Sequence, residues 1–190
     1  TGLGIRPSTV SIGLDQVRAG DKVLVSGPVG DHGIAVMLAR EQFGLRGDLR
    51  SDAASVLPLT RVALAGEGLH FMRDPTRGGL ATVGPELHRA TGLSVVFDGP
   101  ANPVRDPVRA VCEMLGYDPL YLACEGRVVA VTAPAAAEPL LEAWRALPEG
   151  GDAAIVGELR EGRRAVTMTT EIGGERILEE LEDDPLPRIC

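Results

Sequence analysis

The sequence predicts an α/β fold, with α+β character in its second half: a mixed β-sheet with helices packed on it. Two observations support this class. Apolar β-branched runs alternate with segments of helical periodicity in the first half, and two further β-rich runs follow one another after residue 150. The 190 residues are 44% hydrophobic, which is enough for one ordinary core. We therefore assign residues 1–170 to one domain and residues 171–190 to a flexible C-terminal tail.

Strands and helices alternate along the first half of the chain. An apolar run bounded by turn residues predicts a strand, and apolar side chains at helical spacing predict a helix. On these criteria the expected strands are 20–27, 69–73 and 93–98, and the expected helices begin near residues 31, 55, 79 and 106. The last of these helices places Cys112 among apolar neighbours, so we expect an inert core cysteine.

The second half begins with a strand that is apolar on both faces. Residues 128–131 read Val-Val-Ala-Val, as expected of a buried central strand. Residues 134–147 follow as a helix that turns Leu140, Leu141 and Trp144 inward. Two strands, 153–159 and 164–170, are joined through Glu161-Gly162, and this short connection predicts a hairpin.

Charge and composition exclude several classes of protein. The net charge of −8 disfavours a nucleic-acid partner, because no basic patch is available to neutralise phosphates. No apolar run reaches the roughly 18 to 20 residues that cross a bilayer. Residues 1–5 also lack the pattern of a signal peptide, so we expect a cytoplasmic protein. The three cysteines match no zinc motif, and we expect no metal site.

Two helix starts share one pattern, an acidic residue followed by glycine just after a strand. Free backbone N–H groups at a helix start favour an anion, and ligands of open sheets bind beyond the carboxyl ends of strands. The candidate ligand-binding residues are Asp31, His32, Gly33, Asp74, Thr76, Arg77, Gly78 and Gly79. The alternative, equally weighted, is that the aspartates only cap helices and the glycines only turn the chain.

Glu125 and Cys190 are the candidate reactive residues. Glu125 lies between Cys124 and Gly126 at the end of an apolar segment, where a carboxylate can act as a general base. A plain turn residue is the simpler reading of that position alone. Residues 185–190 read Pro-Leu-Pro-Arg-Ile-Cys, which predicts an extended arm carrying a thiol; a frayed terminus is the alternative.

Taken in order, the motifs resemble the HypE family of hydrogenase-maturation proteins, and the resemblance covers nearly the whole chain. HypE proteins belong to the superfamily of aminoimidazole ribonucleotide synthetase and selenophosphate synthetase. The segments that carry the resemblance are 20–33, 72–81, Cys112-Glu113, 118–120, Glu125-Gly126 and the ending Pro187-Arg188-Ile189-Cys190. The resemblance implies the C-terminal α/β domain of such a protein plus its tail, without the N-terminal ATP-binding domain.

The resemblance also implies a reaction and its partners. In that family the terminal cysteine, here Cys190, accepts a carbamoyl group from HypF, and an ATP-dependent dehydration converts the thiocarboxamide to a thiocyanate. The cyanide then passes to the iron of the HypC–HypD complex. Glu125 matches the family's catalytic glutamate. ATP with Mg²⁺ is expected to be bound mainly by the N-terminal domain, so we expect this chain alone to be inactive. We expect the full-length protein to be a homodimer and the fragment a monomer.

One position departs from the family pattern, and two other functions stay open. Cys124 stands where the family usually has asparagine, which puts any polar contact there in doubt. The chain can also be read as the C-terminal domain of a related ATP-dependent synthetase for a small molecule, or as a non-catalytic maturation scaffold. The first reading does not need Cys190, and the second does not need Glu125.

Overall fold

A single mixed sheet of seven strands organises the computed structural model, which describes residues 3, 5, 7, 10–40, 49–162 and 165–180. The strands are β1 (Lys22–Val25), β2 (Leu69–Arg73), β3 (Ser94–Asp98), β4 (Val129–Thr132), β5 (Ala154–Arg160), β6 (Val166–Thr169) and β7 (Glu175–Ile177). Their order across the sheet is β2-β4-β1-β5-β3-β6-β7. The predicted mixed sheet is therefore confirmed.

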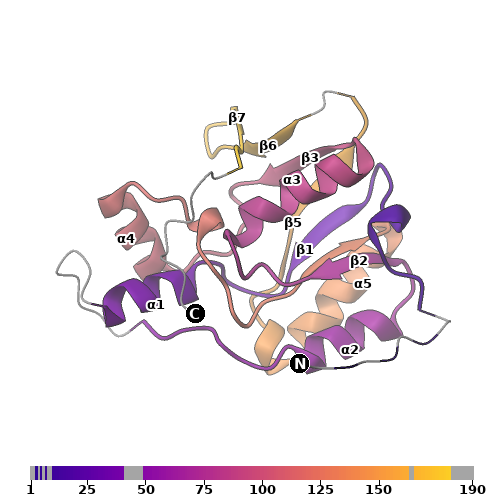
Figure 1. Cartoon of the computed structure of the whole chain (residues 1–190), viewed down its shortest axis with the longest axis horizontal. Coiled ribbons are helices and arrows are strands. Elements are labelled where there is room, and N and C mark those ends of the chain that lie inside the picture. Colours follow the sequence, from indigo (N-terminus) through magenta and orange to yellow (C-terminus); the bar gives the residue numbers. More distant parts are fainter. Residues whose placement is uncertain are drawn as a thin grey trace.

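Five α-helices accompany the sheet in the described part of the chain (Figure 1). They are α1 (Asp31–Ala39), α2 (Leu57–Ala65), α3 (Gly79–Thr91), α4 (Asp106–Leu115) and α5 (Pro134–Arg145). Three short 3₁₀ turns occur at η1 (Leu14–Gln16), η3 (Pro119–Tyr121) and η4 (Pro148–Gly150). The helices lie where the sequence predicts them, to within a few residues.

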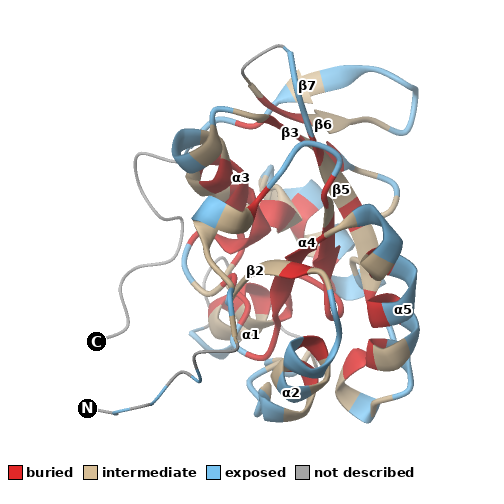
Figure 2. Cartoon of the chain, turned by 90° about the vertical axis from the view of Figure 1, so that its right-hand side faces the viewer, coloured by how far each residue is buried: buried red, intermediate tan, exposed pale blue. Residues whose placement is uncertain are grey.

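The helices bury both faces of the sheet, and Figure 2 shows the buried residues concentrated between the layers. On one face α3 packs Leu80, Val83 and Leu87 against the sheet. On the other face α2 and α5 cover Leu24 and Ala130, and Trp144 of α5 is fully buried there. Helices α1 and α4 pack on each other through a third cluster that includes Ile34 and Cys112. Cys112 is thus a core residue, as predicted.

Strand pairing follows an unusual pattern along the chain. Strand β1 pairs with β4 and β5, β2 pairs with β4, and β3 pairs with β5 and β6. All of these pairs are antiparallel except β3 with β6. The predicted hairpin of residues 153–159 and 164–170 is therefore wrong, because β3 lies between β5 and β6. The hairpin that does form joins β6 to β7.

The domain extends beyond residue 170, where we expected the tail to begin. Strand β7 pairs with β6, Leu178 is buried, and the Tyr121 hydroxyl donates a hydrogen bond to the carbonyl of Glu179. The sequence gives no clear signal for β7, because this edge strand has only three residues and two of them, Glu175 and Arg176, are charged. Residues 181–190, and with them Cys190, lie outside the described residues.

The pairing brings several loops to one edge of the sheet. Because β1 and β2 are both antiparallel to β4, their carboxyl ends meet the amino end of β4: Val25 and Arg73 each pair with Val129. The starts of α1 and α3 and the turn before β4 therefore lie at the same edge. This edge holds the candidate residues of the described chain.

Candidate functional site

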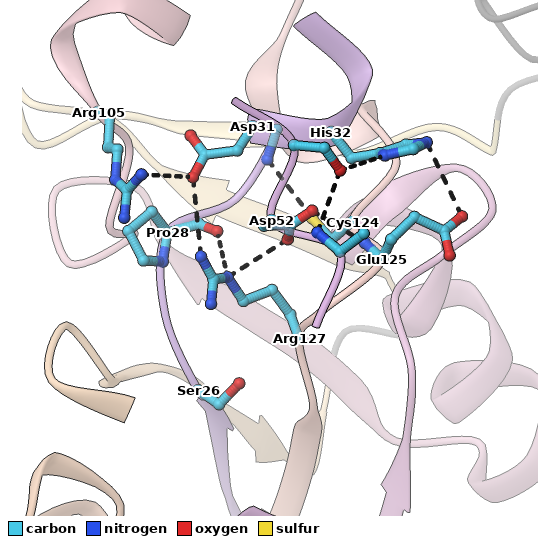
Figure 3. Close-up of polar contacts among 12 residues, drawn as sticks. Ser26, Pro28, Asp31, His32, Asp52, Arg105, Cys124, Glu125 and Arg127 are labelled. Carbon is cyan, nitrogen blue, oxygen red and sulfur yellow. Dashed lines mark hydrogen bonds and ion pairs between the residues drawn. The ribbon is translucent and has the colours of Figure 1, made fainter. Parts of the chain in front are cut away.

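Glu125 lies on the turn that leads into β4, beside the start of α1 (Figure 3). Its side chain is 39% exposed, and its backbone N–H donates a hydrogen bond of 3.1 Å to Oδ1 of Asp52. The next residue must be glycine, because a Cβ on Gly126 would lie 1.9 Å from the carbonyl oxygen of Asp52. The turn is thus fixed from the backbone side while the carboxylate of Glu125 stays accessible.

Beneath this turn, two buried aspartates form an ionic network with two arginines. Arg127 places Nε at 3.4 Å from Asp52 Oδ2 and Nη2 at 3.7 Å from Asp31 Oδ2, and its Nε donates a hydrogen bond to the carbonyl of Pro28. Arg105 approaches Asp31 Oδ2 at 3.2 Å from the solvent side. The network links the loops before α1, α2, α4 and β4, so it holds the whole edge together.

The Asp31 carboxylate is fully buried within this network. Its side chain has no exposed surface, and neither oxygen accepts a hydrogen bond from another described residue. Burial raises the pKa of Asp31 above its ordinary value, and the nearby Arg105 and Arg127 guanidinium groups offset part of that rise. Asp31 therefore has a structural role under the site, and its carboxylate does not reach solvent.

His32 faces Glu125 from the first turn of α1. Its Nδ1 lies 2.9 Å from the Ser51 hydroxyl, and its Nε2 lies 3.9 Å from Oε1 of Glu125. The Ser51 oxygen also accepts the backbone N–H of Ala53 at 3.0 Å. The ring is thus held at one nitrogen and directed at the candidate base with the other.

The two helix starts contact one shared connection, residues 120–124. The N–H of Gly30 donates to the Cys124 sulfur at 3.4 Å, and the N–H of Gly33 donates to the carbonyl of Ala123 at 3.1 Å. The N–H of Cys124 in turn donates to the carbonyl of Pro75 at 3.3 Å, near the start of α3. Burial raises the pKa of Cys124 to about 12, so this thiol stays protonated. It supplies a polar contact as an acceptor.

Close packing accounts for the glycines at these helix starts. Gly79 has a φ of +61°, and a Cβ there would lie 2.3 Å from the carbonyl oxygen of Leu120. A Cβ on Gly33 would lie 3.0 Å from the Leu122 side chain, and one on Gly78, at φ +63°, would meet Thr82. Gly33, Gly78 and Gly79 therefore let the two helix starts pack closely against neighbouring parts of the chain.

The polar residues before α3 are more accessible. Asp74 and Arg77 are exposed, and Thr76 is half-buried. A hydrogen bond with the Thr76 side chain is the main cause that holds the pKa of Asp74 below its ordinary value. Asp74 therefore carries a negative charge at neutral pH, with the cation of Arg77 three residues away.

Among the described residues, no group of three or more His, Cys, Asp or Glu side chains is arranged to hold a metal ion. None of the described helices combines the length and the apolar character required to cross a membrane.

Sequence reasoning missed four residues that support the site: Ser51, Asp52, Arg105 and Arg127. Asp52 and Ser51 lie in a polar loop, and their partners are 73 and 19 residues away in the sequence, so no local pattern reveals them. Arg127 offered one signal. It directly precedes the apolar run of residues 128–131, and an arginine in such a place is buried only with a partner.

Comparison with known families identifies the fold's relatives. Residues 18–169 match the family of the AIR synthase related protein, C-terminal domain. The chain belongs to this family. The match covers every strand from β1 to β6 and all five described α-helices, so the AIR synthase C-terminal domain includes both helix starts and the turn at Glu125.

Among the AIR synthase related proteins, HypE proteins show high sequence and structural similarity to this chain. It is 44% identical over 192 residues to "Carbamoyl dehydratase HypE" of Azotobacter vinelandii, a match that covers 100% of this chain and 56% of that protein. The crystal structure of Escherichia coli HypE aligns with a TM-score of 0.92 at 41% identity, covering 98% of this chain and 58% of the other. The chain thus spans a little over half the length of these relatives.

Two other solved HypE structures carry a partner or a nucleotide. A HypE–HypF complex matches with a TM-score of 0.85 at 37% identity, covering 90% of this chain and 56% of the HypE chain. A HypE structure in complex with ATP matches with a TM-score of 0.81 at 38% identity, covering 92% of this chain and 54% of the other.

Proposed function

We propose that this chain is the C-terminal part of a carbamoyl dehydratase that matures [NiFe]-hydrogenase. Cys190 accepts a carbamoyl group from HypF, the resulting thiocarboxamide is dehydrated to a thiocyanate, and the cyanide passes to the iron of HypC–HypD. The observation that carries this proposal is the accessible carboxylate of Glu125 on a turn that buried Asp52 and Arg127 hold in place. The similarity to HypE along the whole chain supports it.

The chemistry asks for a base at the position of Glu125. Conversion of R–S–C(=O)–NH₂ to R–S–C≡N removes one oxygen and both protons of the nitrogen. ATP supplies the phosphoryl group with which the oxygen leaves as phosphate. Glu125 takes a proton from the nitrogen, a role that contributes about 10²- to 10⁴-fold to a rate. Its backbone anchor limits the turn's movement while the side chain adjusts to the incoming tail.

ATP and Mg²⁺ are bound mainly by the part of the protein that corresponds to the remaining length of its relatives. This chain's own contribution comes from Asp74, Thr76 and Arg77 at the start of α3, because these side chains reach solvent. Arg77 suits a phosphate and Asp74 suits a metal-bound water. We assign Asp31, Gly33, Gly78 and Gly79 to holding the two helix starts in place, and we consider His32 below.

The setting follows from the same proposal. The full-length protein is a cytoplasmic homodimer, whereas this chain by itself is a monomer that neither hydrolyses ATP nor forms thiocyanate. HypF and HypC–HypD meet Cys190 in turn. A HypE–HypF complex among the related structures supports the first of these partners.

The experiment follows the tail by mass spectrometry. The full-length protein is incubated with HypF, carbamoyl phosphate and ATP, and the C-terminal peptide is measured over time. We expect the peptide to gain one carbamoyl group and then lose one water. Cys190→Ala removes both changes, whereas Glu125→Gln gains the carbamoyl group and loses water at least 100-fold more slowly.

The control is Glu113→Gln, which changes an exposed glutamate on α4 and keeps wild-type rates. A carbamoyl group on a residue other than Cys190 contradicts the proposed function. A wild-type rate of water loss in Glu125→Gln contradicts the assignment of the base alone.

A further inference from the structure

The proposed dehydration removes two protons, and a single carboxylate can accept only one of them before it has to be deprotonated again. Two protons leave the same nitrogen, one when the oxygen is phosphorylated and one when phosphate departs. After the first transfer Glu125 is a carboxylic acid and no longer a base. It must lose that proton before the second transfer, so the site needs an exit for protons next to Glu125.

His32 is placed to provide that exit (Figure 3). Its Nε2 lies 3.9 Å from Oε1 of Glu125, a gap that one water or a rotation of the exposed Glu125 side chain closes. Its Nδ1 lies 2.9 Å from the Ser51 hydroxyl, which both donates and accepts. A ring held in this way can take a proton at Nε2 and release another from Nδ1 toward Ser51, which is exposed to solvent.

The other charged groups around α1 are already paired with each other. Arg127 and Arg105 lie against Asp31, and Arg127 also lies against Asp52. These contacts come from the loops before α2, α4 and β4, which surround the first turn of α1. Among the described residues, His32 approaches one oppositely charged side chain, that of Glu125. The exchange of a proton between these two side chains leaves the buried network unchanged.

We propose that His32 is a proton-relay residue that resets Glu125 between the two deprotonations. The Glu125 carboxylic acid gives its proton to Nε2 of neutral His32, which becomes the imidazolium. The imidazolium then gives the proton at Nδ1 to water through the Ser51 hydroxyl. This step returns Glu125 to the carboxylate and leaves the neutral ring protonated at Nε2. The ring regains its Nδ1–H form by exchanging these protons with water before the next cycle. This inference rests on the proposed function and assigns His32 a role that acts through Glu125, instead of contact with the nucleotide.

The test is a pH–rate profile of water loss from the carbamoylated tail, measured with the full-length protein. In the wild type we expect the rate to rise with pH through an inflection, because the relay has to release one proton to solvent in each cycle. His32→Gln lowers the rate about tenfold at pH 8 and removes the inflection, while carbamoylation of Cys190 and the KM for ATP stay unchanged. Added imidazole restores part of the rate in His32→Ala.

His88→Gln is the matched control, because His88 is also partly buried and holds its ring through one contact, with the carbonyl of Leu93. It keeps the wild-type rate and inflection. The inference fails if His32→Gln keeps the inflection, if imidazole restores nothing in His32→Ala, or if the KM for ATP rises at an unchanged profile, since that result assigns His32 to the nucleotide. A wild-type protein that loses no water refutes the proposed function itself.

Discussion

Asp52 accepts the backbone N–H of Glu125 over 3.1 Å, and this contact joins the loop before α2 to the turn before β4. Replacement of Asp52 by alanine leaves that N–H without its partner and removes one of the two carboxylates that Arg127 approaches. We expect Asp52→Ala to lower the free energy of unfolding by about 1–3 kcal/mol and the rate of water loss about tenfold. Urea unfolding and the tail assay measure the two effects. Asp152→Ala, at an exposed aspartate, should change stability by less than about 0.5 kcal/mol.

Arg127 neutralises two buried carboxylates at once. Arg127→Met keeps much of the side-chain volume but leaves Asp31 and Asp52 without this cation, so we expect a loss of about 3–5 kcal/mol in urea unfolding. Arg89→Met is the control: Arg89 pairs with Glu180 at the surface, and such pairs contribute about 0–1 kcal/mol. Adding Asp31→Asn to Arg127→Met should recover part of the loss. A strictly additive double variant would show that the two side chains are not coupled.

Asp31 predicts a specific pH dependence of stability. Because its pKa is raised in the folded protein, the folded state holds the Asp31 proton more tightly than the unfolded state does. The contribution of Asp31 is therefore fully present below its unfolded pKa and is lost as the pH rises through its folded pKa. We expect the free energy of unfolding of the wild type, minus that of Asp31→Asn, to fall as the pH rises above about 4. A difference that rises with pH would have the wrong sign.

Alanine variants of Gly79 and Gly92 distinguish the cost of a left-handed backbone from the cost of a steric clash. Both have a positive φ, +61° and +72°, but a Cβ on Gly79 would collide with the Leu120 carbonyl, whereas nothing lies within 4 Å of one on Gly92. We expect Gly92→Ala to cost about 1–2 kcal/mol, the cost of the left-handed conformation. Gly79→Ala should cost clearly more, by about 2 kcal/mol or beyond, because the backbone of residues 120–122 must move. Equal losses in chemical denaturation would contradict the packing role.

The buried thiols predict selective labelling. Burial raises the pKa of Cys112 to about 11 and that of Cys124 to about 12, and both thiols are nearly inaccessible. Alkylation at pH 7.5 should leave both unmodified in the native protein and modify both in urea, as mapped by peptide mass spectrometry. Cys190→Ala should therefore show no fast-reacting thiol. Rapid native modification of Cys124 would indicate that the connection at residues 120–124 opens.

Local patterns in the sequence predicted the helices and strands, but they did not predict which strands pair with each other. The run 128–131 predicted a strand that is buried on both faces, and the structure places β4 between β2 and β1. No pattern in the sequence predicts that β3 lies between β5 and β6. A strand pairs through backbone groups that every residue has, and the partners of β3 lie about 60 to 70 residues further along the chain. Short connections favour hairpins, and here that preference gave the wrong neighbour.

The candidate site likewise contains residues that local patterns identified and residues that they missed. The pattern of an acidic residue followed by glycine before a helix correctly marked both helix starts as neighbours at one edge of the sheet. The pattern did not reveal that these glycines also allow close packing of the chain. The turn at Glu125 was visible in the sequence, and its resemblance to HypE gave it a role. Its supports, Asp52 and Arg127, follow from a three-dimensional meeting of loops that no spacing encodes.

The strand pairing also determines when the domain can fold during its synthesis. Strands β1, β2 and β3 have their partners in β4, β5 and β6 and none among themselves. During synthesis the first half of the domain therefore leaves the ribosome with its strand edges unpaired, until residues 129 and beyond emerge. A nascent chain stalled before that point should bind chaperones and be cleaved readily, and protection should arise in one step once β5 is available to join β1 to β3.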